Sequence, residues 1–203
     1  MPFNDGFGKT WGLTGKVAFV FGNNGLAHNV SEALANEGVR IVDEITNETS
    51  ILVTIPFDMH SAKINSPDIS PACWSERMEN LFEKPRQITQ QHWPSIKRST
   101  SGRIIHFLGS FEPDKFSVDY AAWGATAAWA KSVIRAVDLG NTTVNMIQPG
   151  VSFDDRLIKK VPMGRGCSVA DVTNLVLFLC SDYASYINGA IIPVDGGLSR
   201  FQR

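Results

Sequence analysis

Short hydrophobic runs alternate with amphipathic stretches along the chain. K-V-A-F-V-F (16–21) is a β-prone run, and the glycine turn after it leads into a helical pattern with Val30 and Leu34 on one side and Gly38 at its end. V-R-I-V (39–42) is expected to be the second strand. A strand, a glycine turn, a helix and a strand within about 30 residues are typical of a dinucleotide-binding βαβ unit.

The third hydrophobic run, I-L-V-T-I (51–55), follows the second after only eight residues. Neighbouring parallel strands need a connection of about a dozen residues or more, so this run is not expected beside the second strand. Eight extended residues span roughly 26 Å, which is enough to reach the far side of the first strand. We therefore predict that one strand-and-helix unit is missing after the second strand.

The rest of the chain keeps the same alternation. We expect a long helix over 74–98 interrupted near Pro85, a strand over 103–108, a helix from Tyr120 to about Leu139, a strand over 144–147, a helix over 169–180 and a strand over 190–194. This alternation predicts an α/β protein with a Rossmann-like, doubly wound parallel sheet and helices on both faces. At a length of 203 residues, one domain over 1–203 is expected.

The composition is that of an ordinary globular protein, with 43% hydrophobic and 19% charged residues. A net charge of −1 leaves no basic excess to neutralise phosphates, so a nucleic-acid partner is not expected. Because no apolar run is long enough for a transmembrane helix and the first residues lack a signal-peptide core, we expect no membrane association and a cytoplasmic location.

Three widely spaced cysteines predict neither a disulfide framework nor a metal site. His106, inside a hydrophobic strand, is expected to be a core histidine.

Several segments, in order along nearly the whole chain, closely resemble short-chain dehydrogenases/reductases. They are T-G-K-V-A-F-V (14–20), S-G-R-I-I (101–105), V-N-M-I-Q-P-G (144–150), V-P-M-G-R (161–165), Y-I-N-G (186–189) and V-D-G-G (194–197), together with Ser110 and Tyr120. The resemblance implies an NAD(P)-binding Rossmann fold and hydride transfer to or from a carbonyl or alcohol carbon. It also implies a serine–tyrosine–lysine triad with a supporting asparagine.

The glycine loop of the resembled family is altered in this chain. F-G-N-N-G-L-A (21–27) keeps Gly22 and Gly25, but it is one residue shorter than the family loop and has Ala27 at the third glycine position. Glycines let the backbone approach a pyrophosphate at a helix N-terminus, and a shorter loop repositions the N–H groups that would hold it. The alternative is an ordinary strand-to-helix turn.

The other parts of the expected cofactor pocket are kept only in part. The resemblance assigns Asp43 to the adenosine ribose hydroxyls, where an acid disfavours a 2′-phosphate, and it adds Pro149 and Gly150 to the cofactor-binding residues. A solvated loop acid is the alternative for Asp43. The family's N-N-A-G motif is replaced by I-P-F (55–57). Together with the missing strand, these changes predict no cofactor or a weakly bound NAD(H).

The resemblance places three catalytic side chains at Tyr120, Ser110 and Asn80. In the family, a lysine four residues after the tyrosine lowers the pKa of the phenol, and here that residue is Gly124. A free tyrosine has a pKa of about 10, so an unassisted phenol is a poor base near neutral pH. Lys115, in the loop before Tyr120, is the remaining candidate for the missing cation.

Two further features concern substrate and partners. Only residues 151–160 separate P-G from V-P-M-G-R, so the segment that covers the substrate in the family is short. The helix after Tyr120 is rich in small residues interleaved with Trp123 and Trp129. We expect an oligomer interface on this helix, because small residues permit close helix approach and exposed tryptophans are common interface anchors. The alternative for the small residues is simple helix propensity, and the alternative for the tryptophans is an internal core position. The resemblance implies a second interface that includes residues 161–197.

Three functions are compatible with these residues. The first is a non-catalytic subunit (a pseudoenzyme) that supports an active short-chain dehydrogenase/reductase homologue in a mixed oligomer, with a homo-oligomer also open. The second is an atypical NAD(H)-dependent oxidoreductase acting on a carbonyl or hydroxyl substrate. The third is a non-redox lyase, isomerase or cyclase that uses the Ser110/Tyr120 pocket. Because fold and chemistry separate easily, the concerted changes in the loop, the lysine position and the lid favour the first.

Overall fold

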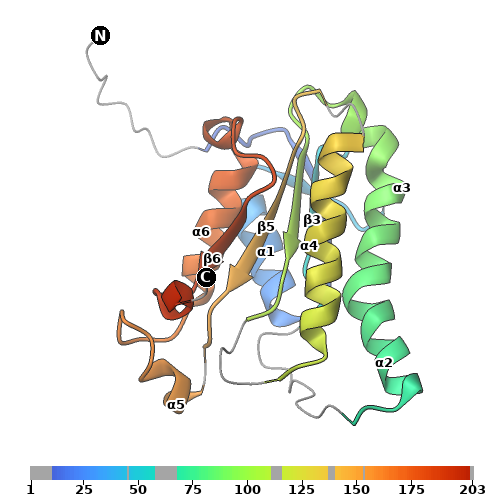
Figure 1. Cartoon of the computed structure of the whole chain (residues 1–203). Helices are drawn as coiled ribbons and strands as arrows, with labels where there is room; N and C mark the ends of the chain where they lie inside the picture. The colour runs from blue at the N-terminus through green and yellow to red at the C-terminus, as the bar shows by residue number, and fades with distance from the viewer. Residues whose placement is uncertain are drawn as a thin grey trace.

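The computed structural model describes residues 11–44, 46–57, 68–110, 116–136, 140–152 and 154–201. Within these ranges, six parallel strands form one sheet in the order β2-β1-β3-β4-β5-β6, with helices on both faces (Figure 1). This arrangement confirms the Rossmann-like α/β fold that the alternation predicts. In the same ranges, none of the helices has the length and apolar character needed to cross a membrane.

The strands are β1 (Val17–Phe21), β2 (Arg40–Ile41), β3 (Ile51–Thr54), β4 (Arg103–Phe107), β5 (Thr143–Pro149) and β6 (Ile191–Val194). The α-helices are α1 (Gly25–Asn36), α2 (Pro71–Met78), α3 (Lys84–Arg98), α4 (Asp119–Ala136), α5 (Asp155–Ile158) and α6 (Val169–Cys180). A π-helical turn, η1 (Glu79–Glu83), joins α2 to α3, and the 3-10 turns η2 (Asp182–Ala184) and η3 (Leu198–Phe201) follow α6 and β6.

β3 pairs with β1 and not with β2, as the short connection predicts. Ala18 of β1 lies opposite Ile51, and Phe21 lies opposite Thr54, so β2 and β3 flank β1 on opposite sides. β2 contains two residues and pairs only with Val17 and Ala18 at the amino end of β1. The connection from β2 to β3 therefore begins and ends near the amino edge of the sheet, which is why so few residues suffice.

Two hydrophobic clusters fill the space between the sheet and its helices. One packs α1 and α6 against the sheet, and the other packs α3 and α4 against the opposite face (Figure 1). Along β4, Ile105 and Phe107 belong to the first cluster, whereas Ile104 belongs to the second. This pattern is expected for a strand that is buried on both faces.

The long helix after β3 is irregular close to Pro85, as expected. Pro85 lies in the first turn of α3, and the irregularity is the π-helical turn η1 just before it, where the N–H of Lys84 bonds to the carbonyl oxygen of Glu79. Proline lacks an N–H and crowds the carbonyl four residues earlier, and a wider turn ahead of it accommodates both effects. Turns of this kind are frequent at functional sites, and η1 carries Asn80.

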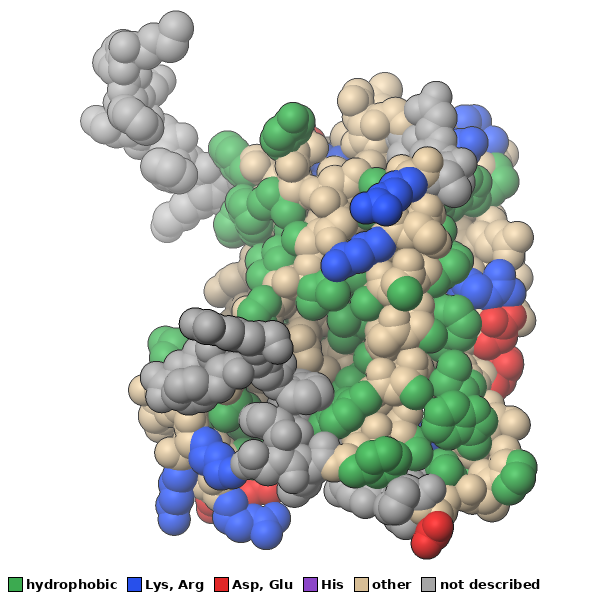
Figure 2. Space-filling view, in the orientation of Figure 1, with side chains coloured by type: hydrophobic (Ala, Val, Ile, Leu, Met, Phe, Trp, Pro, Cys, Tyr) green, Lys and Arg blue, Asp and Glu red, His purple; other side chains and the backbone are tan. Residues whose placement is uncertain are grey.

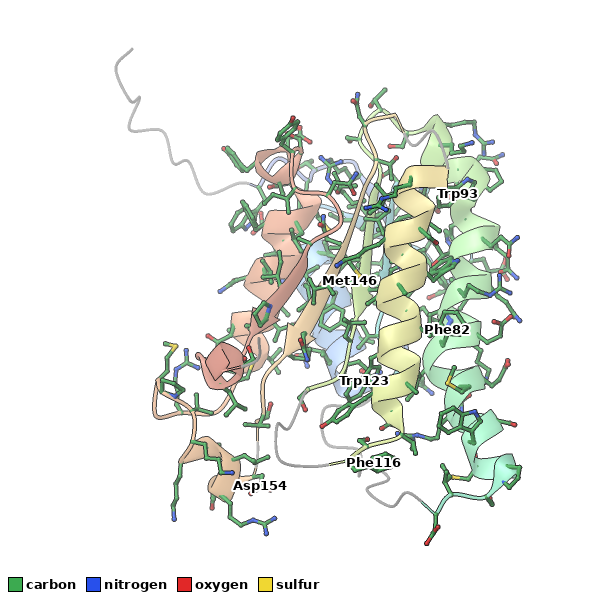
Figure 3. The ribbon with its side chains drawn as sticks, in the orientation of Figure 1. Phe82, Trp93, Phe116, Trp123, Met146 and Asp154 are labelled. Atoms are coloured by element: carbon green, nitrogen blue, oxygen red, sulfur yellow. The ribbon has the colours of Figure 1, made fainter. Side chains whose placement is uncertain are left out.

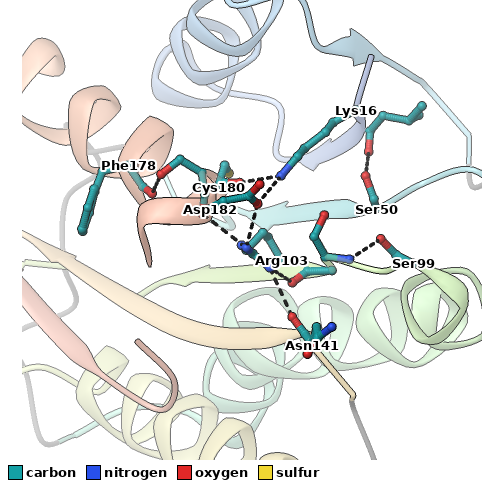
Figure 4. Close-up of polar contacts among 12 residues, drawn as sticks. Lys16, Ser50, Ser99, Arg103, Asn141, Phe178, Cys180 and Asp182 are labelled. Atoms are coloured by element: carbon teal, nitrogen blue, oxygen red, sulfur yellow. Dashed lines mark hydrogen bonds and ion pairs between the residues drawn. The ribbon is translucent and has the colours of Figure 1, made fainter. Parts of the chain in front are cut away.

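A buried arginine links the amino end of β4 to the end of α6 (Figure 4). Arg103 is 1% exposed, and its guanidinium donates hydrogen bonds to the carbonyl oxygens of Gly102 at 2.8 Å and Ser181 at 3.3 Å. Asp182 accepts hydrogen bonds from both Arg103 and Lys16. Cations near the carboxyl end of a helix interact favourably with its dipole, so these contacts hold α6 against the sheet.

The two buried histidines have different neighbours, but the pKa of both is lowered. His106 in β4 places Nδ1 2.8 Å from Oγ1 of Thr54 and packs against Trp129, which confirms its core position. His92 in α3 stacks on Phe19 with ring centroids 4.8 Å apart. Burial lowers the pKa of both imidazoles, that of His106 to about 4, because an apolar environment disfavours the charged form.

The buried histidines predict that acid weakens the fold. An unfolded histidine has a pKa of about 6.5, so between pH 6.5 and 4 the unfolded chain binds protons that the folded chain excludes. The free energy of unfolding should therefore fall as the pH drops through this window, with His106 contributing about 3 kcal/mol in full. Urea unfolding at a series of pH values measures the slope of the free energy of unfolding against pH. In His106→Gln the slope should be clearly smaller, with a remainder from His92, and an unchanged slope would contradict this account.

Candidate functional site

The glycine loop after β1 packs against the end of β3. Gly22 has a φ of 147°, and a Cβ at this position would lie 2.4 Å from the carbonyl oxygen of Ile55, so only glycine fits. Asn24 accepts a hydrogen bond from the N–H of Ala27 and donates one to the oxygen of Ile55, both at 2.9 Å. Gly25 is the exposed first residue of α1. The N–H of Ala27 is therefore used inside the protein, although N–H groups at such a helix start can hold phosphate.

A cleft of about 380 Å³ opens beside this loop. It is lined from the strand ends by Phe21, Asn24 and Phe57, and from the α2–η1–α3 helix by Arg77, Asn80 and Lys84. The chain passes from β1 to β2 on one side and continues in β3 on the other, so the cleft lies at the carboxyl ends of the strands where the strand order reverses. Open α/β sheets bind their ligands at this position. We define this cavity as the switch-point cleft.

Trp123 contacts Tyr120 and the backbone just before Ser110. The ring centroids of Tyr120 and Trp123 are 5.3 Å apart. A Cβ at Gly109, the residue before Ser110, would lie 1.8 Å from the indole of Trp123, so the indole packs directly on this backbone. Trp123 therefore brings the end of β4 and the start of α4 together at the carboxyl edge of the sheet (Figure 3).

Phe57 continues this packing from Trp123 to the switch-point cleft. Its ring centroid lies 6.2 Å from that of Trp123, and its side chain lines the cleft. The aromatic row therefore runs from Phe57 through Trp123 to Tyr120. Trp123 is 7% exposed, and Trp129 packs on His106 with ring centroids 5.6 Å apart. Trp123 is therefore a core side chain, whereas Trp129 is partly buried and also packs edge-on against Phe82. The expected oligomer interface on this helix stays a prediction.

Gly124 lies one helical turn after Tyr120, on the exposed side of α4. A Cβ at Gly124 would meet nothing within 4 Å, so this position has room for the family's lysine but carries no side chain. Lys115, the other candidate cation, lies outside the described residues.

Basic side chains project from the helix that lines the switch-point cleft. Arg77 binds Asp119 through Nε and Oδ1 at 2.7 Å and through a second contact between Nη2 and Oδ2, and the Asp119 side chain is 2% exposed. The hydrogen bond with Asp119 raises the pKa of Arg77. Lys84 donates a hydrogen bond from Nζ to Oδ1 of Asn80 at 2.7 Å. Asn80, expected to support the triad, is therefore engaged with Lys84 at the cleft.

The remaining expected cofactor residues lie on other parts of the sheet. Pro149 ends β5, and the N–H of Gly150 donates a hydrogen bond to the oxygen of Val194 at 2.8 Å. A Cβ at Gly150 would lie 2.7 Å from the Cα of Asp195, so close approach of the chain after β6 requires glycine here. Asp43 is exposed in the bend after β2 and is not part of the cleft lining.

The segment between β5 and α6 is short, as expected. Within its described part, α5 has four residues, and Leu157 packs with Val151, Val161 and Leu198. These contacts anchor α5 to η3 at the lower edge of the molecule in Figure 1. A short, anchored segment excludes water from a substrate less well than a long lid.

A second hollow, of about 340 Å³, lies beside the start of α6. Its charged groups are already committed to local structure. Arg165 binds both carboxylate oxygens of Asp171, which closes the capping box with Ser168. Asp195 accepts hydrogen bonds from backbone N–H groups of the following turn. We therefore assign this hollow to the packing of the chain around α6.

The fold and the site first define a class of protein. A doubly wound parallel sheet with a glycine loop at its switch point is a Rossmann-type nucleotide-binding architecture. A serine after β4 and a tyrosine in the first turn of α4 have the order found in oxidoreductases built on this architecture.

The chain belongs to the short-chain dehydrogenase/reductase family. A family model described as Enoyl-(Acyl carrier protein) reductase matches residues 59–199. The 3-oxoacyl-[acyl-carrier-protein] reductase MabA of Mycobacterium tuberculosis is 33% identical over 127 residues, which are 55% of this chain and 51% of MabA. In that comparison the chain spans about half the length of its relative. The 3-oxoacyl-[acyl-carrier-protein] reductase FabG of Escherichia coli is 25% identical and covers 91% of this chain and 97% of FabG.

Solved structures share the fold at low sequence identity. A gluconate 5-dehydrogenase from Burkholderia cenocepacia, in complex with NADP and tartrate, has a TM-score of 0.80 at 18% identity and covers 94% of this chain and 97% of its own. A putative 2-deoxy-D-gluconate 3-dehydrogenase from Agrobacterium tumefaciens with bound NADP has a TM-score of 0.79 at 21% identity, covering 95% and 99%. These likenesses confirm the architecture.

Sequence reasoning did not single out Arg77 and Lys84. The signal that marks them is their spacing, because Arg77, Asn80 and Lys84 stand at i, i+3 and i+7, which places side chains on one face of a helix. That this face meets the glycine loop depends on the crossing of the helix over β1 and β3, which no local pattern shows.

The contact between Gly109 and Trp123 can be tested by substitution. Gly109→Ala places a Cβ inside the indole, so we expect a loss of about 1–3 kcal/mol in the free energy of unfolding, the usual cost of overpacking. Urea unfolding measures this loss in the wild-type and Trp123→Leu backgrounds. Because leucine is smaller than tryptophan and leaves room for the added Cβ, the loss should shrink by at least half in the Trp123→Leu background. Equal losses in both would show that the indole is not the obstacle.

Proposed function

We propose that this chain is a non-catalytic subunit that supports an active short-chain dehydrogenase/reductase homologue within an oligomer. The observation that carries the proposal is Tyr120 packed against Trp123, with Gly124 in place of a cation one turn away. A free tyrosine has a pKa of about 10 and is a poor proton acceptor near neutral pH, and Gly124 supplies no charge that would lower the pKa. Free cysteines at Cys73, Cys167 and Cys180 favour a reducing compartment such as the cytoplasm.

Nicotinamide binding in this proposal is weak or absent. The solved relatives with bound NADP favour some affinity for a nicotinamide nucleotide. Against tight binding, the N–H of Ala27 is bonded to Asn24, and Asp43 stands outside the cleft. The short segment around α5 further argues against a closed site for hydride transfer.

Exposed surfaces of the chain support association with another subunit. On α4, Ala121, Gly124 and Ala128 are exposed at i, i+3 and i+7, so a second helix can approach closely. Figure 2 shows hydrophobic and uncharged side chains over the middle of this face, with basic side chains near the upper end of α4. Large exposed hydrophobic side chains around α6 and β6 form a further candidate surface: Met163, Val169, Tyr183, Tyr186 and Ile191.

The association can be tested by isolating the native complex. We expect the tagged chain to recover an active short-chain dehydrogenase/reductase from its source cells, with oxidoreductase activity in the complex. Tyr186 is fully exposed, so Tyr186→Asp should lower the recovered homologue at least fivefold without changing thermal unfolding. Asn36→Asp, which adds the same charge at the exposed end of α1, is the control. Recovery of homo-oligomers alone would contradict the proposal of a mixed oligomer.

The catalytic part of the proposal predicts the behaviour of Gly124→Lys. The added side chain meets open space, and replacing glycine inside an exposed helix should raise the free energy of unfolding by up to about 1 kcal/mol. We expect no NADH or NADPH turnover, because the glycine loop and the short lid are unchanged. Gly124→Ala controls for helix propensity in the same assays.

Two results would overturn this prediction. Turnover by the unmodified chain that disappears in Tyr120→Phe would show a working oxidoreductase. Turnover gained only in Gly124→Lys would show that the site is otherwise intact and that one position accounts for the loss.

An atypical NAD(H)-dependent oxidoreductase acting on a carbonyl or hydroxyl substrate is the second candidate. The observation that favours it is the switch-point cleft, which remains open beside the glycine loop and has Lys84 and Arg77 in its wall. The relatives that are 3-oxoacyl-[acyl-carrier-protein] reductases favour a carbonyl substrate for this candidate. The turnover assay with Tyr120→Phe separates it from the first.

A further inference from the structure

Asparagine precedes glycine at two places in the sequence, Asn24–Gly25 in the glycine loop and Asn188–Gly189 before β6. Glycine has no Cβ to shield its backbone nitrogen, so this nitrogen can reach the side-chain amide carbon of the residue before it and close a succinimide ring. This reaction is one reason why asparagine is a thermolabile residue. The two sites contain the same reacting groups, but the fold holds those groups differently.

The attacking nitrogen of Gly25 is available for ring closure. Gly25 is the exposed first residue of α1, and its N–H has no hydrogen-bond partner among the described residues, as expected for the first N–H of a helix. The helix dipole makes the potential positive at this end of α1. Because a positive potential favours loss of a proton, the fold leaves this nitrogen accessible and easier to deprotonate.

The side-chain amide of Asn24 is polarised by the start of the same helix. Its Oδ1 accepts a hydrogen bond from the N–H of Ala27 at 2.9 Å, and the side chain lines the switch-point cleft. A donor aimed at a carbonyl oxygen stabilises the negative charge that develops on the oxygen when a nucleophile attacks the carbon. The hydrogen bond that caps α1 therefore also stabilises the tetrahedral intermediate of ring closure.

The fold protects the second site. The N–H of Gly189 donates a hydrogen bond to the oxygen of Val144 at 2.8 Å, and Oδ1 of Asn188 accepts one from the N–H of Val144 at 2.8 Å. Val144 is a buried residue of β5. Attack by the nitrogen of Gly189 would leave a buried carbonyl oxygen without its donor, which is costly.

We propose that Asn24 is a site of spontaneous deamidation in the folded protein, through which the glycine loop gains a negative charge. The nitrogen of Gly25 loses its proton and forms a bond to Cγ of Asn24. The Cγ–Nδ2 bond then breaks, and Nδ2 leaves with a proton as ammonia. Water opens the succinimide at either carbonyl carbon and gives aspartate or isoaspartate. The net reaction consumes water and releases ammonia, and it needs no oxidant or reductant.

The product fits the loop less well than asparagine does. A carboxylate at position 24 still accepts the hydrogen bond from Ala27, because aspartate is a good helix N-cap. It cannot replace the hydrogen bond that Nδ2 of Asn24 donates to the oxygen of Ile55 at 2.9 Å. Ile55 is fully buried, so its carbonyl oxygen loses a partner and faces a negative charge. Deamidation therefore weakens the contact between the glycine loop and the end of β3.

Peptide mass spectrometry of the full chain, incubated in mildly alkaline buffer at physiological temperature, tests the proposal. We expect Asn24 to be converted at least fivefold faster than Asn188 in the folded chain. In urea, where the fold is lost, the two sites should react at similar rates, because glycine follows both. Equal rates in the folded chain, or faster conversion of Asn188, would overturn the proposal.

Gly25→Ala tests the role of the attacking nitrogen. A Cβ at Gly25 meets nothing within 4 Å, so the variant should fold, while its methyl group shields the nitrogen. We expect conversion of Asn24 to slow at least fivefold and that of Asn188 to stay unchanged. Unchanged conversion of Asn24 would contradict the proposed reaction.

Asn24→Asp reproduces one product and tests its effect on the fold. We expect this variant to unfold at a lower temperature than the unmodified chain. Asn23→Asp, which adds the same charge at the exposed neighbouring residue, is the control. Equal unfolding temperatures for the two variants would show that the contact with Ile55 is not what deamidation disrupts. The proposal goes beyond the proposed function, and these measurements involve neither turnover nor a partner subunit, so their outcome is separate from it.

Discussion

The direct pairing of β3 with β1 is the constraint on which the rest of this structure depends. β2 pairs only with the first residues of β1, so the chain stays near the amino edge of the sheet and crosses to the other side of β1 through a short connection. The strand order reverses at β1 in spite of the missing unit, and the carboxyl ends of β1 and β3 remain neighbours. The glycine loop, the switch-point cleft and the long helix above it all take their positions from this pairing.

Close contacts at glycines then determine how the carboxyl edge is filled. Gly22 lies against the end of β3, Gly109 lies under the indole of Trp123, and Gly150 lies against the chain after β6. Each of these positions excludes a side chain because another part of the chain occupies the space. Among the described residues, Trp123 packs beside Tyr120 at this edge, and a cleft opens beside the glycine loop.

Two arginines at opposite edges of the sheet are held by different partners. Arg103 at the amino edge is buried, and its two Nη groups donate hydrogen bonds to carbonyl oxygens and to Asp182, whereas its Nε has no hydrogen-bond partner among the described residues. These contacts stabilise the junction of β4 with α6. Arg77 at the carboxyl edge is paired with the buried Asp119, and both Arg77 and Lys84 line the cleft. Each arginine therefore joins segments that lie far apart in the chain.

The sequence by itself determined the parallel α/β fold, the missing unit after β2, and the family, because hydrophobic periodicity, connection length and glycine spacing are local properties of the chain. It also located Ser110, Tyr120 and the absent lysine at Gly124. Only the tertiary structure decided that Trp123 turns inward onto Gly109, that the irregularity near Pro85 takes the form of the π-helical turn η1, and that Arg77 and Lys84 line the cleft beside the glycine loop. These outcomes depend on contacts between residues far apart in the chain, such as that of Arg77 with Asp119, and such contacts form only once the helices are packed on the sheet.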